Sequence, residues 1–102
     1  MVMRYHSIEV DREKIAAFCR QHHIRRFSFF GSILREDFQP DSDIDVLVEF
    51  LPGQAPGWFG FVRLALELEA IIGRVVDLRT PADLSDSIRA RALAQSEVQY
   101  AA

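Results

Sequence analysis

The feature that most constrains the fold is the run from Ile44 to Phe50, which is apolar on both faces of an extended strand. Val46 and Val48 share one face and Leu47 lies on the other, because successive side chains of a strand point to opposite sides. A strand that is apolar on both faces must be covered on both. The run therefore predicts a central strand of a sheet, with other layers packed against it.

The segments on either side of this strand predict an α/β fold. Asp11 is a suitable N-cap for a helix over residues 11–23, and Gly73 suits the end of a helix over residues 58–72. We further expect a short helix at residues 33–38, a last helix from residue 85, and strands at residues 25–30 and 74–78. This order of helices and strands predicts a small mixed β-sheet flanked by helices.

Length and composition limit the classes of function. The chain has 102 residues, which is room for one domain, so we treat residues 1–102 as one unit. Its net charge of −3 argues against a general nucleic-acid binder, which is normally basic. Cys19 alone cannot form an internal disulfide, residues 1–6 lack signal-peptide character, and no apolar stretch is long enough for a membrane helix. We therefore expect a cytoplasmic protein that binds neither membranes nor nucleic acid directly.

Two acids stand at the beginning of the central strand. Asp43 and Asp45 are two positions apart, so their carboxylates project to the same side. Neighbouring carboxylates repel each other, and one of them is driven toward protonation unless a cation neutralises the pair. Mg²⁺ is a natural cation here, because it is typically bound by one or two carboxylates together with substrate phosphates.

A calcium loop of the EF-hand type is the competing metal interpretation, because Asp41, Asp43 and Asp45 alternate along the chain. That loop requires glycine at its sixth position and glutamate at its twelfth. This chain has Val46 and Pro52 at those positions. The strand-like continuation also disagrees with a helix–loop–helix, so the sequence favours magnesium.

Gly31 and Ser32 follow the preceding strand and begin a short helix. Glycine lets the backbone approach a ligand closely, and the N–H groups at a helix start attract phosphate. Ser32 adds a hydroxyl donor. A Gly-Ser pair alone is an ordinary turn. Beside an Asp-x-Asp strand it predicts a phosphate-binding turn that faces the same end of the sheet as the acids.

A third acid, Asp77, lies in the short apolar strand over residues 74–78. Two interpretations stay open for its carboxylate. It pairs with a neighbouring arginine, Arg74 or Arg79, or it completes a two-metal site with the two acids of the central strand.

Together these residues resemble a known signature. Gly31-Ser32, then ten residues, then Asp43-Ile44-Asp45 is similar to the signature of the DNA polymerase β-like nucleotidyltransferase superfamily. Nearly the whole chain resembles the minimal (MNT-type) members, and the matching stretches are residues 29–32, 40–48, 73–78 and 88–89. One departure is Glu36, where many relatives have glycine, and it removes no acidic ligand. The resemblance implies the polymerase β palm-like nucleotidyltransferase fold.

The resemblance also implies how a nucleotide binds. ATP is the expected nucleotide, with its triphosphate at Gly31 and Ser32. Arg35 is a further candidate contact to the triphosphate. The alternative for Arg35 is a surface ion pair with Asp37 or Asp41, which contributes little to stability.

The same resemblance assigns the catalytic and metal-binding roles to Asp43, Asp45 and Asp77. These acids are expected to hold two Mg²⁺ ions, which stabilise the attacking and leaving oxygens of an in-line displacement. Asp77 also helps to deprotonate an acceptor hydroxyl. The hydroxyl attacks the α-phosphorus, and pyrophosphate leaves.

Many MNT-type proteins of this size are antitoxins, so the resemblance implies a HEPN-domain ribonuclease toxin as partner in a type VII-like toxin–antitoxin system. The antitoxin transfers AMP from ATP to a tyrosine hydroxyl of the toxin and thereby inactivates it. Two alternatives stay open. One is a transferase that modifies a small molecule, and the other is an antitoxin that neutralises its toxin by contact alone. Retention of the three acids weighs against the last alternative.

The segment over residues 58–72 carries apolar residues on too many sides for a helix at the rim of a small domain. It is either a core helix or a helix with one face in an interface, where aromatic side chains are enriched. We hypothesise that Trp58, Phe59 or Phe61 contacts the partner or a second copy of the chain.

Overall fold

The central strand is β4 (Ile44–Phe50), which lies between β5 (Val76–Arg79) and β3 (Ile24–Phe30) in a four-stranded sheet. β3 is antiparallel to β4, whereas β5 is parallel to it. β6 (Glu97–Ala101) pairs antiparallel with β3 and forms the other edge of the sheet. The prediction of a central strand in a small mixed sheet is confirmed.

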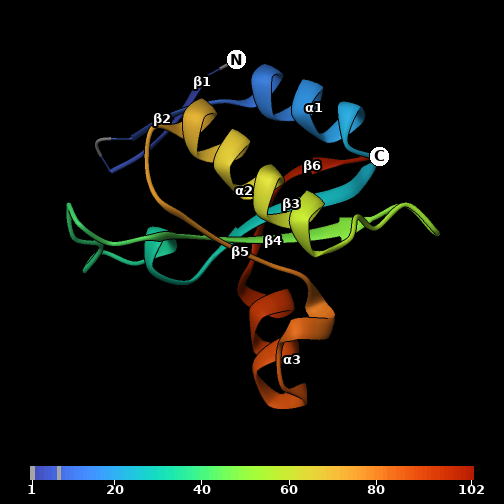
Figure 1. Ribbon diagram of the computed structural model, residues 1–102. Coiled ribbons are helices and arrows are strands. Elements are labelled where there is room, and N and C mark those ends of the chain that lie inside the picture. Colours follow the sequence, from blue (N-terminus) through green and yellow to red (C-terminus); the bar gives the residue numbers. More distant parts are fainter. Residues whose placement is uncertain (1, 7) are drawn as a thin grey trace.

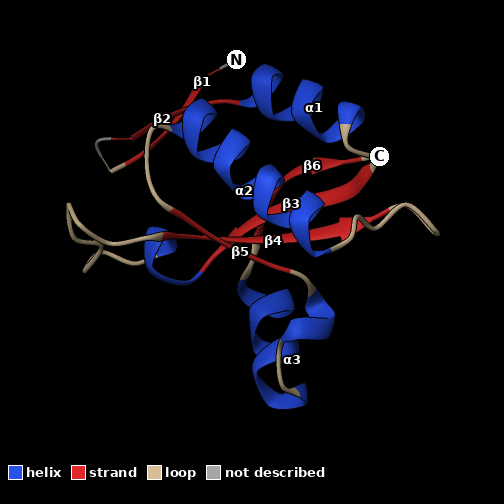
Figure 2. Cartoon of the chain, in the orientation of Figure 1, coloured by secondary structure: helices blue, strands red, loops and turns tan. Residues whose placement is uncertain are grey.

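The computed structural model, which describes residues 2–6 and 8–102, places helices on both sides of this sheet (Figure 1). α1 (Arg12–Gln21) and α2 (Trp58–Ile72) lie on one side, and α3 (Asp86–Gln95) projects from the other (Figure 2). α2 connects the parallel strands β4 and β5, which need a crossover rather than a tight turn. Within the described residues, none of the helices is both long and apolar enough to cross a membrane.

Local signals explain where the two packed helices begin and end. The Asp11 carboxylate accepts hydrogen bonds from the backbone N–H groups of Glu13 and Lys14, at 3.0 and 3.4 Å. Gly73 ends α2 in the left-handed conformation, with φ of 81°. Both residues were expected in these roles, so these boundaries follow from the sequence.

The hydrophobic core lies between the sheet and the layer of α1 and α2. Ile44, Val46 and Val48 alternate along β4 and are fully buried in this cluster. From the two helices the cluster receives Ile15, Phe18, Cys19, Leu64, Leu68 and Ile72. Asp45 and Leu47 lie between the buried β4 positions, so they face the opposite side of the sheet. The acids therefore lie on the face that the core does not use.

Three strands were not predicted from the sequence. They are β6 and the antiparallel pair β1 (Val2–Tyr5) and β2 (Ile8–Asp11). In β6 the polar residues Glu97 and Gln99 alternate with Val98 and Tyr100. Its one buried side chain is the polar Gln99, whose amide donates a hydrogen bond to the Tyr5 hydroxyl at 2.9 Å. Backbone pairing with β3, which a hydrophobic pattern does not reveal, places this strand.

The helix predicted over residues 33–38 is wrong. The structure has a single 3₁₀ turn, η1 (Gly31–Leu34), and the backbone is extended at Arg35. Turns follow, and the Ser42 hydroxyl accepts a hydrogen bond from the backbone N–H of Gln39 at 3.0 Å. Short polar side chains that bond the nearby backbone in this way compete with helix formation.

Candidate active site

The turn after β3 brings Gly31 against the acid at the start of β4. Phe30, the last residue of β3, pairs with Asp45 in the antiparallel register, so Gly31, the next residue of the chain, sits beside that carboxylate. Gly31 has φ of 72°, and a Cβ atom at this position would lie 2.3 Å from Asp45 Oδ2. Only glycine satisfies both the backbone conformation and this close approach.

Ser32 directs two donors at the same end of β4. Its hydroxyl donates to the backbone carbonyl of Asp43 at 3.3 Å, and its backbone N–H donates to the Asp45 carboxylate. The structure thus places the predicted phosphate-binding turn and the first two acids side by side.

The parallel pairing of β4 and β5 places Asp45 directly opposite Asp77. Burial raises the pKa of the half-buried Asp45 carboxyl, and the negative charges of Asp77 and Asp43 raise it further. The N–H of Ser32 and the positive charge of Arg35 act in the opposite direction. The three acids predicted to work together therefore affect one another electrostatically.

Asp77 is engaged by an arginine in this structure. Arg79 donates from Nε and Nη2 to the two carboxylate oxygens of Asp77, at 2.9 and 3.4 Å. This is one of the two pairings that the sequence left open. Arg74 makes no such contact among the described interactions, and its Nη2 donates to the Ser42 carbonyl at 2.7 Å instead. The role of Asp77 as a metal ligand stays a prediction.

Arg35 is exposed, and its Nε lies 3.3 Å from Asp37 Oδ1. This is one of the surface ion pairs named as its alternative. Its positive charge nevertheless lowers the pKa of Asp45. A role for Arg35 in triphosphate binding also stays a prediction.

The donor set suits a hard divalent cation that is bound together with a nucleotide. Within residues 2–6 and 8–102, no three His, Cys, Asp or Glu side chains form a ready metal cage. Mg²⁺ does not need one, since it usually takes one or two carboxylates and completes its shell with water and substrate phosphates. Asp43 and Asp45 supply such a pair. Burial and, to a smaller extent, the negative charges of Asp77 and Asp43 raise the pKa of Asp45, and a bound cation would act in the opposite direction.

A stack of three side chains that the sequence did not single out holds the loop before Asp43. The guanidinium of Arg74 lies 5.1 Å from the centre of the Phe38 ring, and His6 stacks on that ring at 4.9 Å. With the bond from Arg74 to the Ser42 carbonyl, this stack fixes the approach to β4. The one available signal was Phe38, an aromatic residue in an otherwise polar loop.

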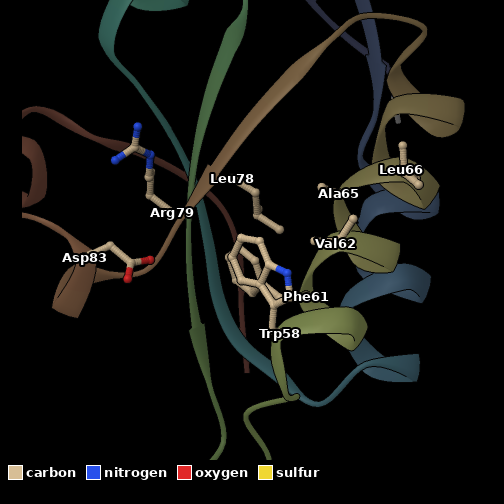
Figure 3. Close-up of a pocket in the computed structure, with 8 residues that line it drawn as sticks. All are labelled: Trp58, Phe61, Val62, Ala65, Leu66, Leu78, Arg79 and Asp83. Atoms are coloured by element: carbon tan, nitrogen blue, oxygen red, sulfur yellow. The ribbon is translucent and has the colours of Figure 1, made fainter.

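A groove of about 530 Å³ runs between α2 and β5, next to the pair of Asp77 and Arg79. Figure 3 shows Trp58 and Phe61 of α2 near Leu78 of β5, with Arg79 and Asp83 on the other side. The groove is lined by Trp58, Phe61, Val62, Ala65, Leu66, Leu78, Arg79 and Asp83. Its walls are apolar next to α2, and Arg79, one of its two charged lining residues, contacts Asp77.

α2 is a core helix with an exposed aromatic beginning. Leu64 and Leu68 are buried in the core, whereas Trp58 is 74% exposed and Phe59 is 87% exposed. Phe61 is only half exposed, and its ring packs edge-on against the ring of Phe50, with 6.5 Å between the two ring centres. Of the three aromatic residues proposed to contact a partner, Trp58 and Phe59 are exposed and Phe61 packs against the core, so the contact itself stays a prediction.

Residues 13–101 match the family described as "Polymerase beta, Nucleotidyltransferase". A relative from Methanocaldococcus jannaschii, named as a candidate protein adenylyltransferase, is 39% identical over 74 residues, which cover 72% of this chain and 77% of the relative.

Two solved structures have a similar fold. The structure of a candidate minimal nucleotidyltransferase has a TM-score of 0.71 and 32% identity, and the match covers 84% of this chain and 86% of that one. A complex of tri-AMPylated Shewanella oneidensis HEPN toxin with MNT antitoxin has a TM-score of 0.65 and 20% identity, with coverage of 89% and 70%.

Proposed function

The chain belongs to the polymerase β nucleotidyltransferase family, and from this premise we propose that it is an antitoxin that transfers AMP from ATP to its toxin. The acceptor is a tyrosine hydroxyl of a HEPN-domain ribonuclease, and the modification inactivates that enzyme. The observation that carries the proposal is the placement of Asp45 between Gly31 and Asp77 at one end of the sheet.

The names of similar proteins support a protein acceptor over a small molecule. The Methanocaldococcus jannaschii relative is named for protein adenylyltransfer, and the similar Shewanella oneidensis complex pairs an MNT antitoxin with an AMPylated HEPN toxin. The name of the relative supports the proposed reaction, and the similar complex supports the proposed partner.

The turn of Gly31 and Ser32 is proposed to receive the triphosphate. Its backbone comes within contact distance of Asp45, and Ser32 offers a hydroxyl and an N–H toward the same place. Arg35 adds a positive charge nearby. These groups orient the α-phosphorus for in-line attack, and positioning of this kind accounts for much of the rate enhancement in phosphoryl transfer.

Asp43 and Asp45 are proposed to hold Mg²⁺, and Asp77 to complete a second metal position. When bound, the metal supplies charge neutralisation for the triphosphate and for the attacking and leaving oxygens. Asp77 is also proposed to take the proton of the tyrosine hydroxyl. The new bond joins the tyrosine oxygen to the α-phosphorus, and the bond between the α-phosphorus and the bridging oxygen breaks to release pyrophosphate.

The toxin is proposed to dock at the exposed beginning of α2. Trp58 and Phe59 are the two most exposed large apolar residues described, and the groove beside Trp58 leads to Asp77 through Arg79. The beginning of α2 lies near the end of β4, where Phe61 packs on Phe50. A docked acceptor is therefore proposed to extend along the groove and past Arg79, which brings its hydroxyl to the acids at the start of β4. We place the reaction in the cytoplasm, which holds ATP and Mg²⁺.

The test is a labelling assay with purified protein, the product of the neighbouring gene as the expected toxin, Mg²⁺ and α-labelled ATP. We expect label on the toxin, at tyrosine by mass spectrometry, and a matching loss of ribonuclease activity. Asp43→Asn and Asp45→Asn should each lower transfer by at least about a hundredfold, because each removes a charge that acts on the transferring phosphate.

Asp41→Asn is the matched control, since Asp41 is an exposed acid of the loop that precedes β4. This variant should transfer AMP at the wild-type rate. Protection of RNA without any label would instead support an antitoxin that works by contact alone. Label on a small molecule and none on the toxin would support the other alternative.

A further inference from the structure

Arg79 occupies a carboxylate that the proposed reaction needs. Its two-pronged contact with Asp77 uses both carboxylate oxygens. Asp77 lies opposite Asp45 in the strand register, in the cluster where negative charges repel one another. In the described structure the guanidinium of Arg79 is therefore the cation that neutralises this side of the cluster.

The surroundings of Arg79 leave it room to move. Its side chain is 46% exposed and that of Asp77 is 40% exposed. Both hydrogen bonds described for the Arg79 guanidinium go to Asp77, and the side chain borders the groove between α2 and β5 (Figure 3). Ion pairs this exposed shift an equilibrium by less than about fivefold, so a divalent cation can displace one.

We propose that Arg79 is a displaceable counter-ion, which holds Asp77 while the acids lack a metal and competes with divalent cations for that carboxylate. The inference rests on the proposed metal-binding role of the acids and adds the group that sets their metal affinity. A side chain that competes for Asp77 weakens metal binding in the absence of nucleotide. A side chain that merely holds Asp77 in position strengthens metal binding. Replacement of Arg79 should therefore raise the metal affinity if Arg79 competes with the metal, and lower it if Arg79 only positions Asp77.

The experiment measures binding of Mn²⁺ alone, without nucleotide or toxin, by electron paramagnetic resonance of the free ion. Mn²⁺ prefers the same oxygen donors as Mg²⁺. Arg79→Gln should bind Mn²⁺ about two- to fivefold more tightly than wild type, the range expected for loss of an exposed ion pair. Arg79→Lys keeps the charge but loses the two-pronged contact, so it should fall between the two.

Arg26→Gln is the matched control, because Arg26 is 47% exposed, pairs with Glu49 at 3.6 Å, and carries the same charge. It should leave Mn²⁺ affinity unchanged, which separates competition at Asp77 from a change in net charge. In the double variant Arg79→Gln/Asp77→Asn, the gain should disappear.

Equal or weaker binding by Arg79→Gln, or a gain that survives Asp77→Asn, would overturn the proposal and leave the proposed function intact. Failure of all variants to bind Mn²⁺ would overturn both the counter-ion role and the metal site. Loss of AMP transfer to the toxin, with the Mn²⁺ pattern as expected, would contradict the proposed function alone.

Discussion

At the scale of single residues, close approach of backbone and carboxylate defines this site. Gly31 and Gly53 have nearly the same positive φ, 72° and 74°, yet a Cβ at Gly31 would meet Asp45 at 2.3 Å and one at Gly53 would meet nothing within 4 Å. Gly53 therefore requires glycine only for its backbone conformation, whereas Gly31 requires it both for its conformation and for the close approach to Asp45.

We expect Gly53→Ala to cost about 1–2 kcal/mol of unfolding free energy, the price of a left-handed alanine. Gly31→Ala should cost about 2–4 kcal/mol, because crowding against Asp45 adds to the same strain. Urea unfolding of both variants measures the difference. Equal losses would show that Asp45 moves aside without cost and that the approach is not tight.

The pH dependence of stability tests the charge on Asp45. Its pKa is raised by burial and by Asp77 and Asp43, so the folded chain holds this proton more tightly than the unfolded chain. Stability from this residue is therefore present at low pH and is lost as pH rises from the ordinary pKa of aspartate through the raised one.

Without metal, Asp45→Asn should thus raise the melting temperature at pH 7, by about 2–4 °C for a gain that solvent screening keeps below about 1 kcal/mol. At about pH 3, below the ordinary aspartate pKa, the wild type and Asp45→Asn should have the same melting temperature. Thermal unfolding by circular dichroism across this range is the measurement, with Asp41→Asn as control. A lower melting temperature at pH 7 would contradict the repulsion inferred among the acids.

At the scale of elements, α3 depends on one arginine for its position. It buries only Ala92, whereas Arg89 donates to the backbone carbonyls of Pro81 and Leu84 at 2.7 and 3.0 Å. These bonds connect the helix to the 3₁₀ turn η2 (Pro81–Asp83) that follows β5.

Arg89→Ala should therefore lower the unfolding free energy by about 1–3 kcal/mol, since two carbonyls lose a charged donor. It should also remove hydrogen-exchange protection from α3 before any other helix. Arg91→Ala, an exposed arginine of the same helix, is the control and should change neither quantity. Uniform loss of protection in every helix would contradict a local role for Arg89.

Elements with a clear hydrophobic pattern were predictable from the sequence. Elements that are held in place mainly by hydrogen bonds to distant residues were not. β4 and α2 were predicted at their observed bounds, because Val46 and Leu47 mark a strand covered on both faces and Gly73 ends a helix. β6 was missed because its buried residue is Gln99, which is polar and is placed by long-range hydrogen bonds.

The candidate site divides in the same way. The sequence spacing predicted that the Gly31 turn and Asp45 face one end of the sheet, because that depends only on strand order. Which arginine meets Asp77 depends on side-chain geometry, so both Arg74 and Arg79 stayed open. The stack of Phe38 with Arg74 joins residues 36 positions apart, and no local pattern announces it.

At the scale of the whole molecule, the residues that form the core and the acids of the candidate site lie on opposite faces of the sheet. One face carries the core beneath α1 and α2, and the other carries Asp45 and Asp77. α2 belongs to both, because Leu64 and Leu68 bury it in the core while Trp58 stands exposed beside the groove. The proposed docking of a toxin at the beginning of α2 therefore uses the surface beside the β5 edge of the sheet.

The last prediction concerns that edge. Trp58→Ala/Phe59→Ala should weaken the complex with the HEPN toxin by at least about thirtyfold in Kd, because exposed aromatic anchors contribute about 2 kcal/mol or more when a partner buries them. Stability and Mn²⁺ binding should be unchanged, since the two side chains are 74% and 87% exposed. Calorimetric titration of toxin into each variant measures the loss. Ile88→Ala/Leu93→Ala, which alters two exposed apolar residues of α3, is the control. An effect confined to this control would move the interface to α3 and contradict docking at α2.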